Sequence, residues 1–262
     1  MINHPVKTHF LTNIKRPVLI PLFLLMMQSF FLSSCSSAYE DTTDPIISTR
    51  IINFSGYEWI VRTSDEGVQG PGPNYFSDSE ENVWVDNQGR LHLKIVNKGG
   101  KWYCSGVTLR RSQGYKKYVF YVASRVDQLD QNVVGGLFTY KNDSEEIDIE
   151  FSKWSKPENQ DSQFAIQPAD KAGNKSRYDL KLKNDLSTHF FSWQPKSIEF
   201  GSYQGHTLQP IADDVINTWT YTGNDIPPEN EENLKINLWL FRGNAPSNNQ
   251  VAEMIIDHVE IL

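Results

Sequence analysis

Acidic and apolar side chains alternate in residues 146–151, which read Glu-Ile-Asp-Ile-Glu-Phe. Successive side chains of a β-strand point to opposite faces, so Glu146, Asp148 and Glu150 would share one face. The β-branched isoleucines favour a strand and would lie on the other face. Successive carboxylates would be about 6.6 to 7 Å apart at Cα. At that spacing they repel each other and their pKa values diverge, which acid/base chemistry can use.

This arrangement suits hydrolysis of a glycosidic bond, in which one carboxylate attacks the anomeric carbon and a second carboxyl group protonates the leaving oxygen. Retention of configuration needs these two groups about 5 to 5.5 Å apart, and inversion about 6.5 to 9.5 Å. Glu146 and Glu150 are up to about 13 Å apart at Cα in an extended strand. On a strand bent around a concave cleft their side chains could lean to the retaining distance, with Asp148 sharing a proton between them. The alternative is a structural segment, the solvated face of an edge strand.

Composition and charge narrow the class of protein. The chain has 262 residues, of which 39% are hydrophobic and 12% aromatic, enough for one domain with a sizeable core. Three of the 25 basic residues and none of the 32 acidic ones lie in the first 34 residues, so the remainder carries a net charge of −10. This charge argues against nucleic acid as a partner. It favours a neutral polysaccharide over a polyanionic one unless a local basic patch exists.

Residues 1–34 have the pattern of an export signal: a basic region from Lys7 to Arg16, then an apolar stretch too short for a membrane span. The following Leu-Ser-Ser-Cys resembles a bacterial lipobox, which implies that Cys35 becomes the lipidated first residue of the mature protein. Residues 35–49 would then form the lipidated cysteine and a polar tether. An ordinary secretory signal, with Cys35 incidental, is the alternative. Cys104 is the only other cysteine, so we expect no intrachain disulfide.

Short strand-like runs separated by turn residues fill the chain from residue 50 to 262, and no segment of ten or more residues has a convincing helical period. The turn Asp-Asn-Gln-Gly at 86–89, followed by the alternating run 91–96, is one example. More than a dozen such runs in one domain predict an all-β fold, a two-sheet antiparallel β-sandwich with a concave cleft.

The acidic segment resembles the catalytic strand of glycoside hydrolase family 16, whose members include laminarinases, lichenases, agarases, carrageenases and xyloglucan transglycosylases. Other segments resemble that family in the same order along the chain: Asn82–Val85 with Gly89 and Leu91, Leu137–Tyr140, His189–Pro195, Ile236–Trp239 and Ile256–Val259. Any one short match is weak, whereas five in order around the acidic strand are specific. The resemblance covers nearly the whole mature chain and implies a jelly-roll, concanavalin A-like sandwich.

The resemblance also implies roles for the three acids. Glu146 matches the nucleophile, Glu150 the general acid/base and Asp148 the assisting aspartate. Their Glu-x-Asp-x-Glu spacing implies a regular strand, because the other form of the family inserts a bulge with one more residue.

Four residues match positions that line the sugar subsites of the family: Phe138, Tyr140, Asn237 and Trp239. An aromatic face packs well on the apolar face of a sugar, which suits Tyr140 and Trp239. Many members also hold a structural calcium ion, and Asp257 and the carbonyl of Gly89 match two of its ligands. Calcium takes about six to eight oxygen ligands, so two matches do not make a site. The chemistry itself implies no cofactor.

The sequence departs from the lichenases of the family at sugar-contacting positions. A lichenase-like enzyme would carry an acid near Gly106, an arginine near Thr108, tryptophan at Ser144, and asparagine and tyrosine at Ala165 and Gln167. Substrate specificity therefore differs from that of lichenases. Arg110, Arg111 and Arg177 could face an acidic sugar, although solvated surface charges are the more common role of arginine.

Two classes of function remain open. The first is a monomeric, retaining, endo-acting glycosidase that cleaves a β-linked glucan or related galactan, tethered by Cys35 to a membrane of the bacterial cell envelope and facing the periplasm or the exterior. A transglycosylase of the same fold is a variant of it. The second is a lectin-like jelly roll that binds glycan without cleaving it. The intact set of three carboxylates favours the enzyme, because a lectin does not need them.

Overall fold

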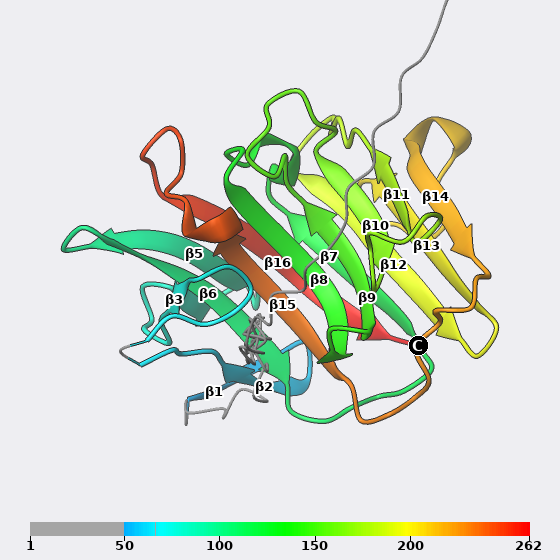
Figure 1. The fold of residues 1–262 in the computed structure, drawn as a ribbon, viewed down its shortest axis with the longest axis horizontal. Coiled ribbons are helices and arrows are strands. Elements are labelled where there is room, and N and C mark those ends of the chain that lie inside the picture. Colours follow the sequence, from blue (N-terminus) through cyan, green and yellow to red (C-terminus); the bar gives the residue numbers. More distant parts are fainter. Residues whose placement is uncertain (1–49, 66) are drawn as a thin grey trace, which may run out of the picture. The chain divides into compact units, whose positions relative to one another are not determined.

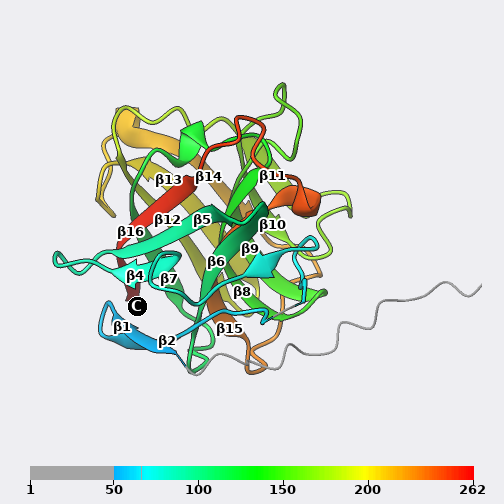
Figure 2. The ribbon, with the colours of Figure 1, turned by 90° about the vertical axis from the view of Figure 1, so that its left-hand side faces the viewer.

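The computed structural model describes residues 50–65 and 67–262, which form a sandwich of two β-sheets (Figures 1 and 2). The predicted signal peptide, Cys35 and the tether lie outside these residues. Within the described part of the chain, no helix is long and apolar enough to span a membrane.

The first sheet, here called the front sheet, contains the acidic segment. Its strands, in spatial order, are β11 (Lys175–Tyr178), β10 (Ser162–Ile166), β9 (Glu145–Phe151), β8 (Val133–Asn142), β15 (Asn233–Leu240), β6 (Lys101–Leu109), β2 (Tyr57–Val61) and β1 (Ile51–Phe54). All of these neighbours pair antiparallel.

The second sheet, here called the back sheet, covers one face of the first. Its strands, in spatial order, are β4 (Val83–Val85), β5 (Leu91–Lys98), β16 (Ala252–Ile261), β7 (Lys117–Ala123), β12 (Leu186–Gln194), β13 (Ser197–Gln204) and β14 (Val215–Tyr221). Three short 3₁₀ helices lie in the connections: η1 (Val126–Gln128), η2 (Ala212–Asp214) and η3 (Phe241–Gly243).

Two features go beyond the predicted antiparallel sandwich. The ends of β5 and β6 pair around the turn at Gly99 and Gly100, so the two sheets join at this corner. Both glycines have positive φ angles, 60° and 85°, as two-residue hairpin turns require. In addition, the short strand β3 (Tyr75–Phe76) pairs with β6 in parallel. The predicted all-β sandwich is confirmed, since every other strand pair is antiparallel.

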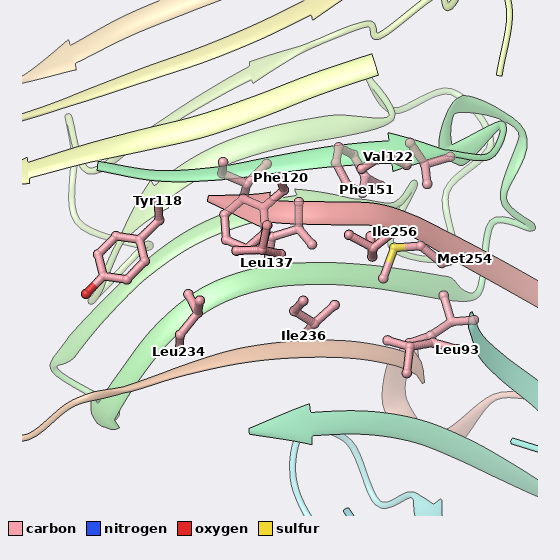
Figure 3. Close-up of a cluster of buried hydrophobic side chains, with 14 of the residues drawn as sticks. Leu93, Tyr118, Phe120, Val122, Leu137, Phe151, Leu234, Ile236, Met254 and Ile256 are labelled. Carbon is pink, nitrogen blue, oxygen red and sulfur yellow. The ribbon is translucent and has the colours of Figure 1, made fainter. Parts of the chain in front are cut away.

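The core lies between the sheets (Figure 3). Ile147, Ile149 and Phe151 of β9 are fully buried in it. Leu137 and Ile236 of the front sheet join them and face Phe120, Val122 and Ile256 of the back sheet (Figure 3). Burying a side chain of this size contributes about 1.5 to 3 kcal/mol. The apolar half of the alternating segment therefore determines which way β9 faces, and its acids point away from the core.

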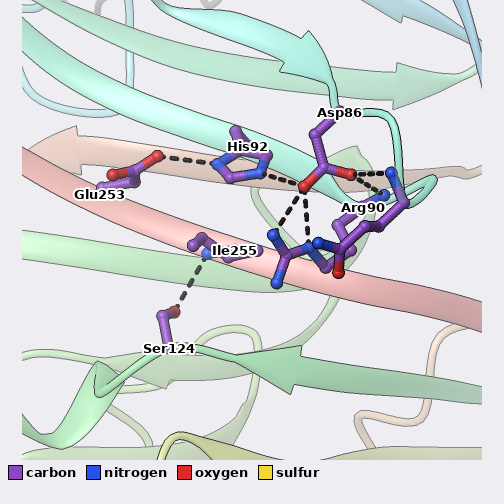
Figure 4. A network of polar contacts seen from close by, with 7 residues as sticks. Asp86, Arg90, His92, Ser124, Glu253 and Ile255 are labelled. Atoms are coloured by element: carbon purple, nitrogen blue, oxygen red, sulfur yellow. Dashed lines mark hydrogen bonds and ion pairs between the residues drawn. The ribbon is translucent and has the colours of Figure 1, made fainter.

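A polar network ties the β4–β5 turn to β16 in the back sheet (Figure 4). His92 lies between two carboxylates, with Nδ1 2.8 Å from Glu253 Oε1 and Nε2 3.1 Å from Asp86 Oδ2. Asp86 also accepts hydrogen bonds from the backbone and side chain of Arg90. These donors hold the pKa of Asp86 well below its usual range, although burial opposes them. The network closes the predicted 86–89 turn, in which the amide of Gly89 donates to Asp86 O.

Candidate active site

The three acids lie on a central strand of the front sheet, because β9 is hydrogen-bonded to β8 on one side and to β10 on the other. The edge-strand alternative is therefore wrong. The pairing of β9 with β10 runs from Phe151 to Ile147 without a register shift, as the Glu-x-Asp-x-Glu spacing implies. Asp148 is only 3% exposed and its two acidic neighbours are half-buried, although all three side chains point away from the core.

Two glutamines of the neighbouring chain segment hold the acids. Gln163 Nε2 donates to Glu150 Oε2 over 2.5 Å, and Gln167 Nε2 donates to Asp148 Oδ2 over 3.0 Å. Gln163 is fixed in turn, because its Oε1 accepts a hydrogen bond from Arg177 Nε at 3.1 Å. Since arginine can only donate, the amide nitrogen of Gln163 must face Glu150. Glu150 Oε2 is thus a hydrogen-bond acceptor, and Oε1 remains for a proton.

Glu146 and Asp148 lie close enough on β9 for an interaction between their carboxyl groups to lower the pKa of Glu146 and raise that of Asp148. Two ionised carboxylates offer only acceptors, so a hydrogen bond between them requires a proton on one of them. Burial raises the pKa of Glu146 to about 8, with the charge of Glu150 adding to the rise and Lys235 opposing it. Burial and both neighbouring carboxylates raise the pKa of Asp148 well above its ordinary value. Burial and mutual repulsion therefore favour the protonated forms of this pair.

Glu150 differs from that pair in the groups around it. Burial raises its pKa, whereas the Gln163 hydrogen bond and the positive charges of Arg177 and Lys175 lower it. One oxygen is held as an acceptor and cations lie on the same side, so Glu150 has a different proton affinity from Glu146. Two carboxyl groups in unlike surroundings are the usual basis for separate acid and base roles.

Two glycines and an asparagine continue the row of Glu150 across the neighbouring strands. Gly136 of β8 is opposite Glu150, Asn237 of β15 is opposite Gly136, and Gly106 of β6 is opposite Asn237. A Cβ atom at Gly106 would lie 2.3 Å from Asn237 Oδ1, so a larger residue would displace that side chain. Asn237 is 1% exposed, and its Nδ2 has no acceptor among the described residues. The acidic side chain that a lichenase would carry near Gly106 would therefore require Asn237 to move.

The aromatic residues predicted to bind sugar lie on the same face as the acids. Tyr140 is opposite Glu146, and Phe138 is opposite Asp148. Tyr140 is not an open platform, because the ammonium of Lys235 lies 4.3 Å from its ring centre and its hydroxyl donates to Asp143. Trp239 is half-buried at the far end of β15, with its ring 6.5 Å from that of Phe241.

No sequence motif assigns functional roles to Gln163, Gln167 or Lys235. A signal for them exists, because the segment 162–166 alternates in step with the acidic strand and places Gln163 on the acid face. Without the register of β10 against β9, however, the partner of each glutamine is unknown. Lys235 lies two residues before Asn237 on β15 and so shares its face.

The side chains nearest to Asp257 are two imidazoles. Asp257 Oδ2 is 2.8 Å from His258 Nδ1 and 4.0 Å from His206 Nδ1. Within residues 50–65 and 67–262 no three His, Cys, Asp or Glu side chains form a group that could hold a metal. Calcium prefers oxygen ligands, whereas imidazoles surround this carboxylate. The predicted site at Asp257 and Gly89 stays a prediction, and no step of the chemistry depends on it.

No protein-family model matches the chain, and no curated protein matches it. Solved structures of bacterial glucanases do. The chain is similar to a β-glucanase of Bacillus licheniformis, with 19% identity, a TM-score of 0.57, and 77% of this chain and 91% of that one covered. A lichenase from a mouse hindgut metagenome has 20% identity and a TM-score of 0.56, over 78% and 92% of the two chains.

A third similar structure is described as a pseudo β-1,3-glucanase of Mycobacterium tuberculosis. It is 17% identical, with a TM-score of 0.58, and the match covers 78% of this chain and 90% of that one. The fold expected from the resemblance to family 16 is therefore confirmed. Because this fold occurs both in glucanases and in a protein described as a pseudo-glucanase, fold alone does not decide activity.

Proposed function

We propose that this protein, which has the fold of bacterial β-glucanases, is a retaining endo-acting glycoside hydrolase that cleaves a β-linked polysaccharide. The observation that carries the proposal is the set of three carboxyl groups on the outer face of β9, each with a defined partner. Three neighbouring acids on one strand, one buried and two half-buried, destabilise a sheet. Such an arrangement is expected where catalysis uses it.

In the proposed reaction, Glu146 attacks the anomeric carbon while Glu150 donates its proton to the leaving oxygen, and the glycosidic bond breaks. The sugar is then bonded to Glu146 as an ester. Glu150, now ionised, removes a proton from water, which displaces Glu146 and regenerates both groups. Retention follows because the anomeric carbon is attacked twice, from opposite sides.

The partners of each acid support these roles. A proton on Asp148 lets it donate to Glu146, which must be ionised when it attacks. Burial raises the pKa of Glu146, and Lys235 opposes that rise, which favours the ionised form needed for attack. Gln163 occupies Glu150 Oε2 and so directs the transferable proton to Oε1. The buried Nδ2 of Asn237 is a donor that a sugar oxygen could satisfy after a small movement.

Products released from soluble β-glucans, agars and carrageenans test the proposal. The unchanged protein should shorten at least one of these polymers, Glu146→Gln should not, and Glu145→Gln should retain activity. Glu145 is the matched control, because it precedes Glu146 on β9 and bonds with Asn142 and Asn230 instead of the other acids. Proton NMR of the first products should show the retained anomer. An inverted anomer at early times would contradict the role of Glu146 as nucleophile.

Chemical rescue distinguishes the two glutamates. Azide should restore turnover of an activated glycoside by Glu150→Ala and give a product of retained configuration, since the ester with Glu146 still forms. Azide should not restore a retained product in Glu146→Ala. The opposite pattern would mean that Glu150 is the nucleophile and Glu146 the general acid/base.

A glycan-binding protein without activity is the second candidate, since one structural neighbour is described as a pseudo-glucanase. It predicts that the unchanged protein and Glu146→Gln bind the same polysaccharide equally well and that neither releases products. A transglycosylase would instead give longer products when a second saccharide is supplied as acceptor. In either case, we propose a site of action at the bacterial cell envelope, which the predicted export signal and lipobox-like segment support.

A further inference from the structure

Two basic side chains lie on the acid face at the β11 edge of the front sheet. Arg177 is opposite Gln163, which is itself opposite Glu150, and Lys175 is opposite Ala165 in the next row. Adjacent strands are about 4.7 to 4.9 Å apart, so both residues are about 10 Å from the backbone of β9. They are close enough to lower the pKa of Glu150 by their charge.

The guanidinium of Arg177 is held in place through its Nε, and its terminal nitrogens remain available as donors. Its Nε donates to Gln163, and its Cζ lies over the ring of Trp154, 4.3 Å from the ring centre. A stacked arginine is oriented by the ring while its terminal nitrogens remain available. Within residues 50–65 and 67–262, no acceptor takes those terminal nitrogens.

Lys175 is also unpaired in the described part of the chain. Its side chain is exposed, and its ammonium has neither a hydrogen bond nor an ion pair there. Lys175 and Arg177 are two residues apart on one strand, about 6.6 to 7 Å at Cα, and share a face. One small anion can contact two cations at that spacing.

The lysine on the other side of the acids is different. Lys235 lies over Tyr140, next to Glu146, and Asp143 bonds with the same tyrosine. Its charge is therefore balanced locally. Arg177 and Lys175, which have no ion pair within 4.0 Å among the described residues, lie on the β11 side next to Glu150.

We propose that the polysaccharide carries anionic groups, and that Arg177 and Lys175 bind one of them beside Glu150. This inference rests on the proposed hydrolysis and specifies its substrate class. A sulfate ester or a carboxylate presents oxygens that match the planar fork of arginine, with lysine as a second point charge. The site lies on the side of the group that protonates the leaving oxygen, so the anion would belong to the leaving part of the chain. The overall negative charge of the protein does not oppose this, because the patch is local.

Matched polymer pairs test the proposal: a β-glucan and its carboxymethylated form, and a carrageenan and its chemically desulfated form. The ratio of kcat/KM for the charged polymer to that for its neutral partner is the readout, because defects in the chemical step cancel from it. The unchanged protein should prefer the charged member of at least one pair. The pair that shows the preference identifies carboxylate or sulfate as the group bound.

Lys175→Met and Arg177→Gln should each reduce that preference by about tenfold or more, the usual effect of losing a charged hydrogen bond. Lys117→Met is the matched control, since Lys117 lies over Phe190 in the back sheet, and it should keep the preference. About 1 M salt should weaken the preference, because screening then acts within about 3 Å. The proposal would be overturned if the unchanged protein turned over the neutral member of both pairs as fast as the charged member, or faster. An unchanged ratio in Lys175→Met would also overturn it.

Binding separates this inference from the proposed function. If no polymer is cleaved, retardation of the protein in gels that contain each polymer still reports charge preference. Stronger retardation by a charged polymer that Lys175→Met weakens would support the anion site while hydrolysis fails. Equal retardation by the charged and neutral members of both pairs would refute the anion site.

Discussion

Gln163 donates a hydrogen bond to Glu150 across the β9–β10 pairing, with Nε2 2.5 Å from Oε2. Arg177 fixes the orientation of that amide, so the glutamine offers Glu150 a donor and never an acceptor. This contact stabilises the ionised form of Glu150 and opposes the rise of its pKa caused by burial. The pKa of Glu150, and so the pH range in which it can donate a proton, therefore depends on a glutamine of the neighbouring strand.

Gln163→Leu should raise the pKa of Glu150 further, because it removes a donor that favours the ionised form. A general acid works only while protonated, so the alkaline limb of the pH profile of kcat/KM should move to higher pH. The maximal rate should also fall, since Glu150 loses its support. Gln209→Leu, at an exposed position of the chain, should leave the profile unchanged. A shift of the limb to lower pH would contradict this role of Gln163.

Asp148→Asn should lower activity without abolishing it and should change the acidic-to-neutral limb of the pH profile. The amide cannot release a proton as the carboxyl group of Asp148 can, although it can still donate to Glu146. General acid/base contributions are about 10² to 10⁴-fold, and a loss beyond that range would mean that Asp148 itself reacts. Steady-state kinetics between pH 4 and 9 measure both effects.

The stability of the protein should fall as pH rises through the window set by Glu146. Its folded pKa of about 8 lies above the ordinary value of 4.5, so the folded state binds more protons than the unfolded state between these values. Glu146→Gln removes this penalty. The variant should therefore gain more thermal stability at pH 8 than at pH 4.5.

Since Glu146 is half-buried, water moderates the effect, and each kcal/mol corresponds to about 2 to 4 °C in a domain of this size. Thermal unfolding of both proteins at the two pH values measures it, with Glu145→Gln as the control. An equal gain at both pH values would show that burial does not perturb Glu146.

Gly106→Ala should displace Asn237, because the new Cβ would lie 2.3 Å from Asn237 Oδ1. Asn237 ends in a flexible amide that can shift, so we expect little change in the free energy of unfolding. The KM for polysaccharide should rise, since the side chain of Asn237 on the acid face moves. Gly67→Ala is the control, because a Cβ there would meet only the Ser64 carbonyl oxygen at 3.9 Å. Unchanged KM in Gly106→Ala would mean that Asn237 does not contact substrate.

Cys35→Ala should release the protein from membranes if Cys35 carries the lipid. A single lipidated cysteine at the start of the mature chain would be the whole anchor in that case. Fractionation of cells that express each form, followed by immunoblotting, measures the distribution. Cys104→Ala is a matched control for the loss of a thiol, because Cys104 is free and buried in the front sheet. An unchanged distribution of Cys35→Ala would show that Cys35 is not lipidated.

Much of this fold could be predicted from local pattern. The alternation of residues 146–151 identifies a strand and both of its faces, because side chains in strands alternate whatever the surroundings. The turn at 86–89 is equally local, and Gly89 has the positive φ, 82°, that glycine adopts at little cost. For the same reason the orientation of the three acids away from the core follows from the isoleucines between them.

The partners of those acids depend on pairings between segments distant in the sequence. Whether β9 is an edge or a central strand was decided by its bonds to β8 and β10, which an alternating segment does not encode by itself. The contact of Gln163 with Glu150 depends on register, since a slip of one residue would turn Gln163 toward the core. Asn237 and Gly106 are separated by about half the sequence, and only the pairing of β15 with β6 brings them together.

The charged groups that surround each candidate side chain also depend on the tertiary structure. Tyr140 has the residue type of a sugar platform, yet Lys235 from β15 lies over its ring. Asp257 has the residue type of a calcium ligand, yet His206 and His258 surround its carboxylate. The residue type determines which chemistry a side chain is capable of. Its proton affinity and its partners follow from the neighbouring strands, because electrostatic and hydrogen-bond energies depend on distances that only the folded sheets determine.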